Sequence, residues 1–341
     1  MAICYAASRA SVLVVHNVAE PDTGLRPAGT LSLTEHSIEC LDATSDARER
    51  AFCGTFDAGL HRSTDGGGTW ERVGEATLPE SVTSVTVSPH DPDVVYAGTE
   101  PSAVFRSEDG GDTWSELPGL TDLPSASAWA FPPRPDTHHV RWIEVDPGDP
   151  DHLYVAVEAG ALLQTHDAGD TWEKRSPSTR RDTHEMAIHS DEPGTVRAAA
   201  GDGYAESHDA GETWSFPQDG LRHRYCWSVA VDPGDPDRVL LSAAASARRA
   251  HRSASAASYL YRRTDTGSDA SAWTRLTDVD VPTGEGVLRA TLASGTEAGE
   301  LFALTDRGLF RTVDGGGSFT RVDVAWPESF RDQTSRGLAI V

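Results

Sequence analysis

One octapeptide recurs along most of this chain and limits the folds that the chain can adopt. The first copy is Ser63–Trp70, with Asp at its third position, Gly at its fifth and Trp at its eighth. Further copies occupy residues 107–114, 165–172, 207–214 and 312–319, and a degenerate copy lies at 263–273. The aspartates of successive copies stand 42 to 58 residues apart. A period of this length predicts a repeat of small antiparallel sheets, as in the blades of a β-propeller.

Each repeat has the same internal order of strand signals. A β-rich run such as 84–88 leads into a Pro/Asp turn at 89–93, and two further runs follow at 94–98 and 104–106. The octapeptide then closes a hairpin into a fourth strand that begins near its Trp. We therefore predict an all-β fold of four-stranded antiparallel blades, whose strands are called A to D from the centre outward.

The number of repeats predicts seven blades. Blades 1 to 6 span about residues 36–335 and end at the six octapeptides. Residues 1–35 supply three more strands and residues 336–341 supply one, so that both ends of the chain would build blade 7. Closing the ring in this way removes exposed sheet edges. We expect a single β-propeller domain over residues 1–341.

The octapeptide residues have a structural explanation. The Asp carboxylate can accept backbone N–H groups across the turn, and Gly at the fifth position permits a positive φ. The large, flat Trp fills the gap between neighbouring sheets. We expect structural roles for the following residues: Asp65, Trp70, Asp109, Trp114, Asp167, Trp172, Asp209, Trp214, Asp265 and Asp314.

The pattern Ser/Thr-x-Asp-x-Gly-x-Thr-Trp, spread over residues 63–319, resembles the Asp-box, or BNR repeat, of sialidases, sortilin-type receptors, xyloglucanases and photosystem II assembly factors. The resemblance implies a propeller but no single activity, because enzymes and non-enzymes share the repeat. Sialidases of this family have six blades, which counts against that assignment. Xyloglucanase-like enzymes place their acidic pair between two propellers, whereas one ring is expected here.

The chain is strongly acidic, with 53 Asp and Glu against 29 Lys and Arg, a net charge of −24 and a single lysine, Lys174. This charge argues against nucleic-acid and anionic-membrane binding. It is typical of halophilic proteins, although a GC-rich genome would also remove lysine. The sequence has no signal-peptide pattern and no apolar run near the roughly 18 residues of a membrane span. We expect a cytoplasmic monomer with four reduced, buried cysteines: Cys4, Cys40, Cys53 and Cys226.

In a propeller the A–B and C–D turns share one face, and the D–A and B–C loops form the opposite face, which we call the top face. Four unusual top-face loops, at 115–141, 173–185, 215–225 and 244–258, carry 11 basic and seven acidic residues. Such a sector would attract an anionic ligand. The alternative is that its arginines pair with nearby carboxylates and hold the loops in place.

Three of the predicted A strands begin with histidine or aromatic residues, at 137–143, 183–188 and 223–228. Their starts should converge near the propeller axis. The converging set could bind a metal through imidazoles or an anion through Arg and His. We favour the anion and expect no metal or other cofactor. The ligand-binding candidates are His138, His139, Arg141, His184, Arg222, His223, Arg224, Arg248, Arg249 and Arg252.

Two functions remain in view. The first is a non-catalytic binding or assembly propeller, similar to the photosystem II assembly factors, that recognises an acidic protein, an anionic small ligand or a glycan. The second is a sialidase-like glycoside hydrolase acting on an acidic sugar at the pore mouth. Such an enzyme needs a Tyr nucleophile with a Glu partner, for which Tyr225 and Glu185 are the candidates. The Arg-Ile-Pro segment of sialidases is absent, and we favour the binding protein.

Overall fold

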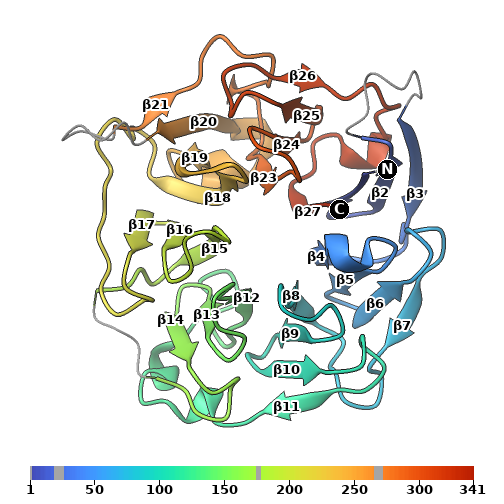
Figure 1. Cartoon of the computed structure of the whole chain (residues 1–341), viewed down its shortest axis with the longest axis vertical. Coiled ribbons are helices and arrows are strands. Elements are labelled where there is room, and N and C mark those ends of the chain that lie inside the picture. The colour runs from blue at the N-terminus through green and yellow to red at the C-terminus, as the bar shows by residue number, and fades with distance from the viewer. Residues whose placement is uncertain (1, 19–26, 174–177, 265–271) are drawn as a thin grey trace.

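The computed structural model describes residues 2–18, 27–173, 178–264 and 272–341. Seven antiparallel sheets stand around a central channel (Figure 1). Each sheet has one strand against the channel, and those strands are β4 (Ile38–Ala43), β8 (Val82–Val87), β12 (Val140–Val145), β15 (Thr183–Ile188), β18 (Tyr225–Asp232), β23 (Thr291–Ser294) and β27 (Ser335–Ile340). The predicted all-β, seven-bladed propeller is confirmed.

The remaining strands follow outward in each blade. The second strands are β5 (Ala51–Thr55), β9 (Val95–Thr99), β13 (Leu153–Val157), β16 (Val196–Ala200), β19 (Asp235–Ala244), β24 (Leu301–Thr305) and β1 (Ile3–Ser8). The third strands are β6 (Leu60–Ser63), β10 (Val104–Ser107), β14 (Ala161–Thr165), β17 (Gly203–Ser207), β20 (Ala257–Thr264), β25 (Gly308–Thr312) and β2 (Val12–His16). The outermost strands are β7 (Glu71–Val73), β11 (Ser115–Leu117), β21 (Thr274–Arg275), β26 (Thr320–Arg321) and β3 (Ala28–Ser32), and β22 (Gly284–Glu285) adds to β20.

Blades 3 and 4 differ from the four-stranded expectation, because each has a three-stranded sheet within the described residues. In blade 4 the outer strand is reduced to a single bridge between Glu206 and Ser215. Pro217 follows two residues later, and proline lacks the N–H group that a longer ladder needs. In blade 3 the described residues after the octapeptide bond to the third strand through the Glu173 N–H, which donates to the Gln164 carbonyl at 2.9 Å.

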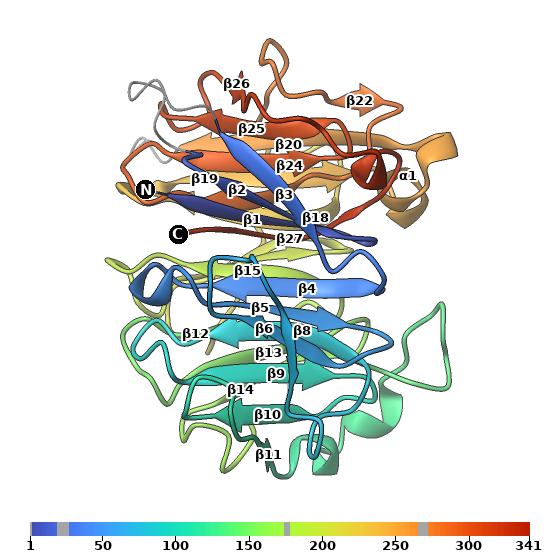
Figure 2. The ribbon, with the colours of Figure 1, turned by 90° about the vertical axis from the view of Figure 1, so that its right-hand side faces the viewer.

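The ring closes with strands from both ends of the chain. β27 pairs antiparallel with β1, so the sheet order is β27-β1-β2-β3. Beyond the ladder, Ile3 and Val341 exchange two backbone hydrogen bonds of 2.6 and 2.9 Å. Both ends of the chain therefore lie beside the channel strands, as Figure 1 shows and the edge-on view in Figure 2 confirms.

Apolar side chains between adjacent blades form the core, and the second strands are buried along most of their length. Glycines lie where the inner strand of the next blade crosses closely. A Cβ at Gly98 would stand 2.5 Å from the Val140 side chain, and one at Gly54 would stand 2.7 Å from the Val82 carbonyl oxygen. These contacts set how tightly successive blades pack.

The octapeptide turns hold themselves shut as predicted. In the first copy the Asp65 carboxylate accepts from the Thr69 N–H and hydroxyl at 2.8 and 2.7 Å, and from the Ser63 hydroxyl at 2.9 Å. The Ser63 oxygen in turn accepts the Gly67 N–H at 2.9 Å. The same contacts recur around Asp109, Asp167, Asp209 and Asp314. Asp265 lies outside the described residues.

Backbone geometry and packing complete these turns. The glycine at the fifth position has a φ between 82° and 94° in the five complete copies. The aromatic side chains pack between blades, with Trp114, Trp214 and Phe319 buried and Trp70 and Trp172 partly buried. Each complete turn also bonds to the A–B turn of its own blade, for example Gly110 N–H to the Asp93 carbonyl at 2.9 Å. Both kinds of turn therefore share one face, which we call the octapeptide face.

The four cysteines, all within the described residues, are buried and unpaired.

The only α-helix in the described part of the chain is α1 (Ala247–His251), which follows β19 on the top face (Figure 2). Among these residues no helix has the length and apolar character needed to cross a bilayer.

Candidate functional site

Six of the seven inner strands have a bulge at the end where they enter from the top face, and β23 pairs with β24 without one. In β12, Val140 pairs with Val157 and Trp142 pairs with Ala156, so that Arg141 is an extra residue without a partner on β13. The extra residues in this and the equivalent bulges are Glu39, Thr83, Arg141, His184, Trp227 and Arg336. We call these six side chains the bulge ring. A bulge turns its side chain away from the regular alternation of a strand, which gathers these groups around the channel mouth.

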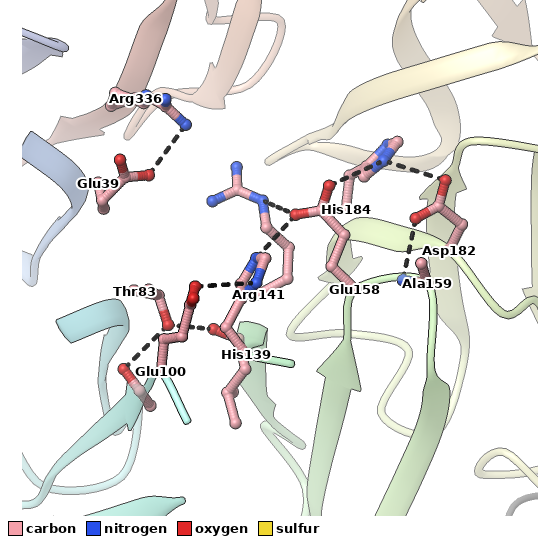
Figure 3. A network of polar contacts seen from close by, with 12 residues as sticks. Glu39, Thr83, Glu100, His139, Arg141, Glu158, Ala159, Asp182, His184 and Arg336 are labelled. Carbon is pink, nitrogen blue, oxygen red and sulfur yellow. Dashed lines mark hydrogen bonds and ion pairs between the residues drawn. The ribbon is translucent and has the colours of Figure 1, made fainter. Parts of the chain in front are cut away.

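Two members of the bulge ring are tied to the next blade. The Thr83 hydroxyl donates to the Val140 carbonyl at 2.7 Å, and His184 Nδ1 donates to the Cys226 carbonyl at 2.7 Å. In both cases the acceptor is the residue directly before the next bulge. Arg336 instead pairs with Glu39 at 3.0 Å, on the far side of the channel from His184 (Figure 3). Contacts between blades therefore position four members of the bulge ring, namely Glu39, Thr83, His184 and Arg336.

Glu158, which directly follows β13, lies at the centre of the polar network (Figure 3). Its Oε2 atom accepts from His139 Nε2 at 2.9 Å and lies 3.9 Å from Arg141 Nε. Its Oε1 atom lies 4.0 Å from His184 Nε2. Burial raises the pKa of Glu158, but the His139 hydrogen bond and the neighbouring positive charges outweigh burial and hold this pKa well below its usual range. Glu158 is therefore ionised.

Asp182 reaches the same place from the loop before β15. Its Oδ1 atom accepts the Ala159 N–H at 3.0 Å, and its Oδ2 atom lies 3.7 Å from His184 Nε2. Burial raises the pKa of Asp182 and lowers the pKa of the fully buried His184. Asp182 and Glu158 are thus two neighbouring carboxyls whose surroundings push their pKa values in opposite directions.

A directional chain of hydrogen bonds leads to His184 from blade 6. Arg289 Nε donates to His251 Nδ1 at 3.1 Å, and His251 Nε2 lies 2.9 Å from the Tyr225 hydroxyl. Arginine can only donate, so the neutral His251 carries its proton on Nε2 and donates it to Tyr225. Burial lowers the pKa of His251 to about 2, which keeps it neutral. The Tyr225 hydroxyl is then free to donate to His184 Nε2, at 3.5 Å.

Three arginines, Arg141, Arg289 and Arg336, concentrate positive charge beside this chain of hydrogen bonds. Arg289 is 1% exposed, and its Nη1 and Nη2 atoms have no hydrogen-bond partner among the described residues. Its guanidinium carbon stacks 3.5 Å from the Trp227 ring centroid, and that of Arg141 lies 4.7 Å from the same centroid. Burial lowers the pKa of Arg289, and the charges of Arg336 and Arg141 lower it further. A buried cation without a carboxylate partner is costly, so this arrangement needs an explanation.

The structure brings four of the predicted residues together at the channel mouth: His139, Arg141, His184 and Tyr225. It places His138 apart from them, edge-on to Trp129 at a centroid distance of 5.4 Å. Glu185 faces the next blade, where its carboxyl accepts from the Ser228 hydroxyl at 2.7 Å and the Val229 N–H at 3.1 Å. The bulge at His184 turns the side chains of His184 and Glu185 in different directions. Tyr225 therefore bonds to His184 and His251 and not to Glu185.

The other predicted residues lie farther out on the top face. Arg222 and Arg224 are exposed, and His223 stacks on Tyr259 with a centroid distance of 4.0 Å. In and after α1, Arg249 pairs with Glu285, while Arg248 and Arg252 are exposed. We call Arg222, Arg224, Arg248 and Arg252 the rim arginines. Lys174 and Arg175, which contribute to the basic loops, lie outside the described residues.

Sequence reasoning missed Glu158, Asp182, Trp227, Arg289 and Arg336 as site residues. Two signals could have found some of them. Arginine stands at the second position of β12 and of β27, and just before β23. An acidic residue also follows the second strand closely in several blades, as at Glu100, Glu158 and Asp306.

Below the channel mouth the inner strands enclose a cavity of about 360 Å³. Three carboxyls lie on its wall, of which Glu185 is buried and Asp42 and Glu144 are partly buried. Burial raises the pKa of Asp42 to about 7 and the pKa of Glu144 and Glu185 to about 8. The wall beneath the charged mouth therefore carries three carboxyls whose pKa values are raised above their usual range.

No protein-family model matches the sequence, and no characterised protein matches it in a sequence search. Solved structures match its fold. The GH74 enzyme of Niastella koreensis aligns with 92% of this chain at 16% identity and a TM-score of 0.64, but with only 53% of its own length. YCF48 from Cyanidioschyzon merolae aligns over 85% of this chain and 86% of its own, at 15% identity and a TM-score of 0.58. A structure of YCF48 bound to D1 peptide aligns over 84% of this chain and 81% of its own, at 18% identity and a TM-score of 0.55.

At these identities the matches show the fold alone. The chain spans about half the length of the GH74 enzyme and most of the length of the two YCF48 structures. The set includes both enzymes and a propeller captured with a peptide. Both functions foreseen from the sequence therefore remain compatible with the structural matches.

Proposed function

We propose that this chain is a non-catalytic binding or assembly propeller whose channel mouth recognises a carboxylate group of an acidic partner. The observation that carries this proposal is Arg289, a buried guanidinium with two unpartnered nitrogen atoms beside Arg141 and Arg336. A carboxylate is the planar, two-oxygen anion that a guanidinium binds through paired hydrogen bonds.

The charges around the channel mouth support an anionic ligand. Arg336 is matched by Glu39, and Glu158 is shared between His139 and Arg141. Arg289 has no ion pair among the described residues. Arg289 is thus a cation at the channel mouth that lacks a carboxylate partner in the described part of this strongly acidic chain, and a bound anion would supply one.

A peptide is the ligand class that the comparisons favour. YCF48 has been solved with a D1 peptide, and that propeller matches this chain over most of both lengths. The octapeptide resembles Asp-boxes, but that resemblance extends to enzymes and binding proteins and does not choose between them. We therefore place a peptide carboxylate, either a side chain or a chain end, against Arg141 and Arg289.

Binding of short acidic peptides with free carboxyl ends, compared with the same peptides amidated, tests this proposal. The free peptides should bind in calorimetry, and the amidated ones should bind more weakly if the chain end is the recognised group. Arg141→Gln should weaken binding by about 2 kcal/mol, or roughly thirtyfold, because it removes a charged hydrogen bond. Arg72→Gln, on the exposed outer strand β7, is the matched control. Equal affinities for wild type and Arg141→Gln would contradict the proposal.

A glycoside hydrolase is the second candidate, and one observation favours it. The Glu158 and Asp182 carboxylates lie within 4.8 Å of one another, and their pKa values are shifted in opposite directions, as in pairs of a nucleophile or base with an acid. Purified protein should then cleave chromogenic glycosides of acidic sugars, and Asp182→Asn and Glu158→Gln should each abolish cleavage. Activity that survives both substitutions would exclude this pair.

A further inference from the structure

We propose that His184, Asp182 and Glu158 form a binding site for one divalent transition-metal ion such as Zn²⁺. This site adjoins the carboxylate-binding arginines, because Glu158 Oε2 lies 3.9 Å from Arg141 Nε, but it does not depend on the proposed function. Its three potential ligand atoms, His184 Nε2, Asp182 Oδ2 and Glu158 Oε1, lie within 4.8 Å of one another. One imidazole nitrogen with two carboxylate oxygens is a donor set that suits Zn²⁺ and disfavours Mg²⁺ or Ca²⁺.

Each of the three side chains is held by a protein contact through its other polar atom. His184 Nδ1 donates to the Cys226 carbonyl, Asp182 Oδ1 accepts from Ala159, and Glu158 Oε2 accepts from His139. These contacts orient Nε2, Oδ2 and Oε1 toward a common point. In metal sites the ligands are oriented in this way, with the second imidazole nitrogen bonded to a carbonyl or carboxylate.

The distances between the three atoms also indicate that something belongs between them. Because Nδ1 carries the proton of neutral His184, Nε2 presents a lone pair toward two carboxylate oxygens at 3.7 and 4.0 Å. These separations are too long for hydrogen bonds. They are slightly wider than the roughly 3.4 Å expected between two tetrahedral zinc ligands at about 2.1 Å from the ion. To complete the coordination, the two nitrogen–oxygen separations would contract by about 0.3 and 0.6 Å, and the two carboxylate oxygens, within 4.8 Å of one another, would approach by up to about 1.4 Å.

An ion could reach this site from the top face. His184 is fully buried, but the side chain of Asp182 is 32% exposed and that of Glu158 is 13% exposed. The Tyr225 hydroxyl, 3.5 Å from His184 Nε2, donates to the same lone pair and would turn away from it when a metal binds. Three protein ligands leave a fourth position of a tetrahedral ion open for water.

Titration of metal-free, full-length protein with Zn²⁺ by calorimetry tests the site. We expect one equivalent to bind, Co²⁺ to give the visible bands of a four-coordinate ion, and Mg²⁺ to give no comparable binding. Asp182→Asn keeps the Ala159 hydrogen bond and should lose at least about tenfold in Zn²⁺ affinity. Asp202→Asn, at a more exposed carboxylate of the same blade, should bind Zn²⁺ like wild type.

His139→Ala provides a second, independent variant. It leaves the three ligands in place but removes the contact that orients Glu158, so that affinity should fall by about 10 to 100-fold. Circular dichroism of each variant establishes that it is folded. The proposal is overturned if wild type binds no stoichiometric Zn²⁺, or if Asp182→Asn and Asp202→Asn bind it equally.

Discussion

The octapeptide turns and the bulge ring are both repeated around the propeller, one on each face, yet they differ in what is repeated. Each octapeptide turn repeats its side chains, and its Asp, Ser or Thr and Gly satisfy one another within eight residues. The bulge ring repeats only its backbone geometry, and its side chains differ from blade to blade. The first pattern explains the fold, and the second allows one position of the repeat to carry different chemistry in each blade.

The largest effect should follow from breaking the octapeptide face. Trp214→Ala removes an aromatic side chain that is 8% exposed and packs between blades, so that the free energy of unfolding should fall by about 4 kcal/mol. Urea denaturation measures this loss. The exposed Phe216→Ala is the control and should cost far less. Peptide affinity of the folded Trp214→Ala protein should be unchanged, and a large loss of affinity would show that the two faces are coupled.

A smaller effect should follow from pH, through the channel wall below the bulge ring. Burial raises the pKa of Glu185 to about 8, so the folded state holds its proton where the unfolded chain has released it. Stability should be greatest below about pH 4.5 for this group and should fall until about pH 8. Glu185→Gln should therefore match wild type near pH 4 and exceed it by at least about 1.4 kcal/mol near pH 8 to 9.

Urea denaturation of both proteins across this pH range isolates the contribution of Glu185, since other titrating groups, including Asp42 and Glu144, are present in both. A difference between the two proteins that is independent of pH would contradict the prediction.

Replacing the unpartnered cation should have the opposite sign to Trp214→Ala. Arg289→Met keeps the approximate length of the side chain and removes a buried charge that has no ion pair in the described structure, so that unfolding should become about 1 kcal/mol less favourable. The gain is small because His251 loses its donor. The same variant should lose carboxylate-peptide binding. Arg336→Met, which breaks the pair with Glu39, is the contrasting control and should destabilise the protein.

The smallest effect should come from the rim arginines. Arg252 is exposed, so Arg252→Glu should change peptide affinity by less than about 1 kcal/mol, mainly through a slower association rate at low salt. Stopped-flow kinetics at two ionic strengths measures this change. A loss of affinity as large as that of Arg141→Gln would indicate that the peptide binds at the rim and not at the channel mouth.

The fold could be predicted because its information is local. The eight residues of the octapeptide include the Asp, the Ser or Thr and the Gly that fix the geometry of its turn. The number of residues between successive copies is enough for only one small sheet. Ring closure followed from the strand-like segments left at both ends, and β27 pairs with β1 as expected. The described sheets of blades 3 and 4 have three strands and not the expected four, and in blade 4 Pro217 follows the single bridge at Ser215.

The site could be predicted only in part, because alternation along a strand fails at a bulge. The expected convergence of the A-strand starts is found for His139, Arg141, His184 and Tyr225, whose role in binding stays a prediction. The bulge at His184 turns Glu185 toward Ser228, which no count of alternate residues could reveal. Glu158 was missed because it lies in the loop between β13 and β14 and not at the start of an A strand. Only the closure of blades into a ring brings this loop beside β15.

The placement of Arg336 has a consequence for how ligand and fold influence each other. This residue lies on β27, the strand that closes the ring, whereas Arg141 lies on β12 in blade 3. An anion bound against Arg141 and Arg289, beside the charge of Arg336, would bind the closed form more tightly than an opened one, and it would stabilise the closed form in proportion to the logarithm of its concentration. Ligand binding should therefore slow amide hydrogen exchange along β27 and β1, the two strands that close the ring. Exchange in these strands would then measure how fully the channel mouth is occupied.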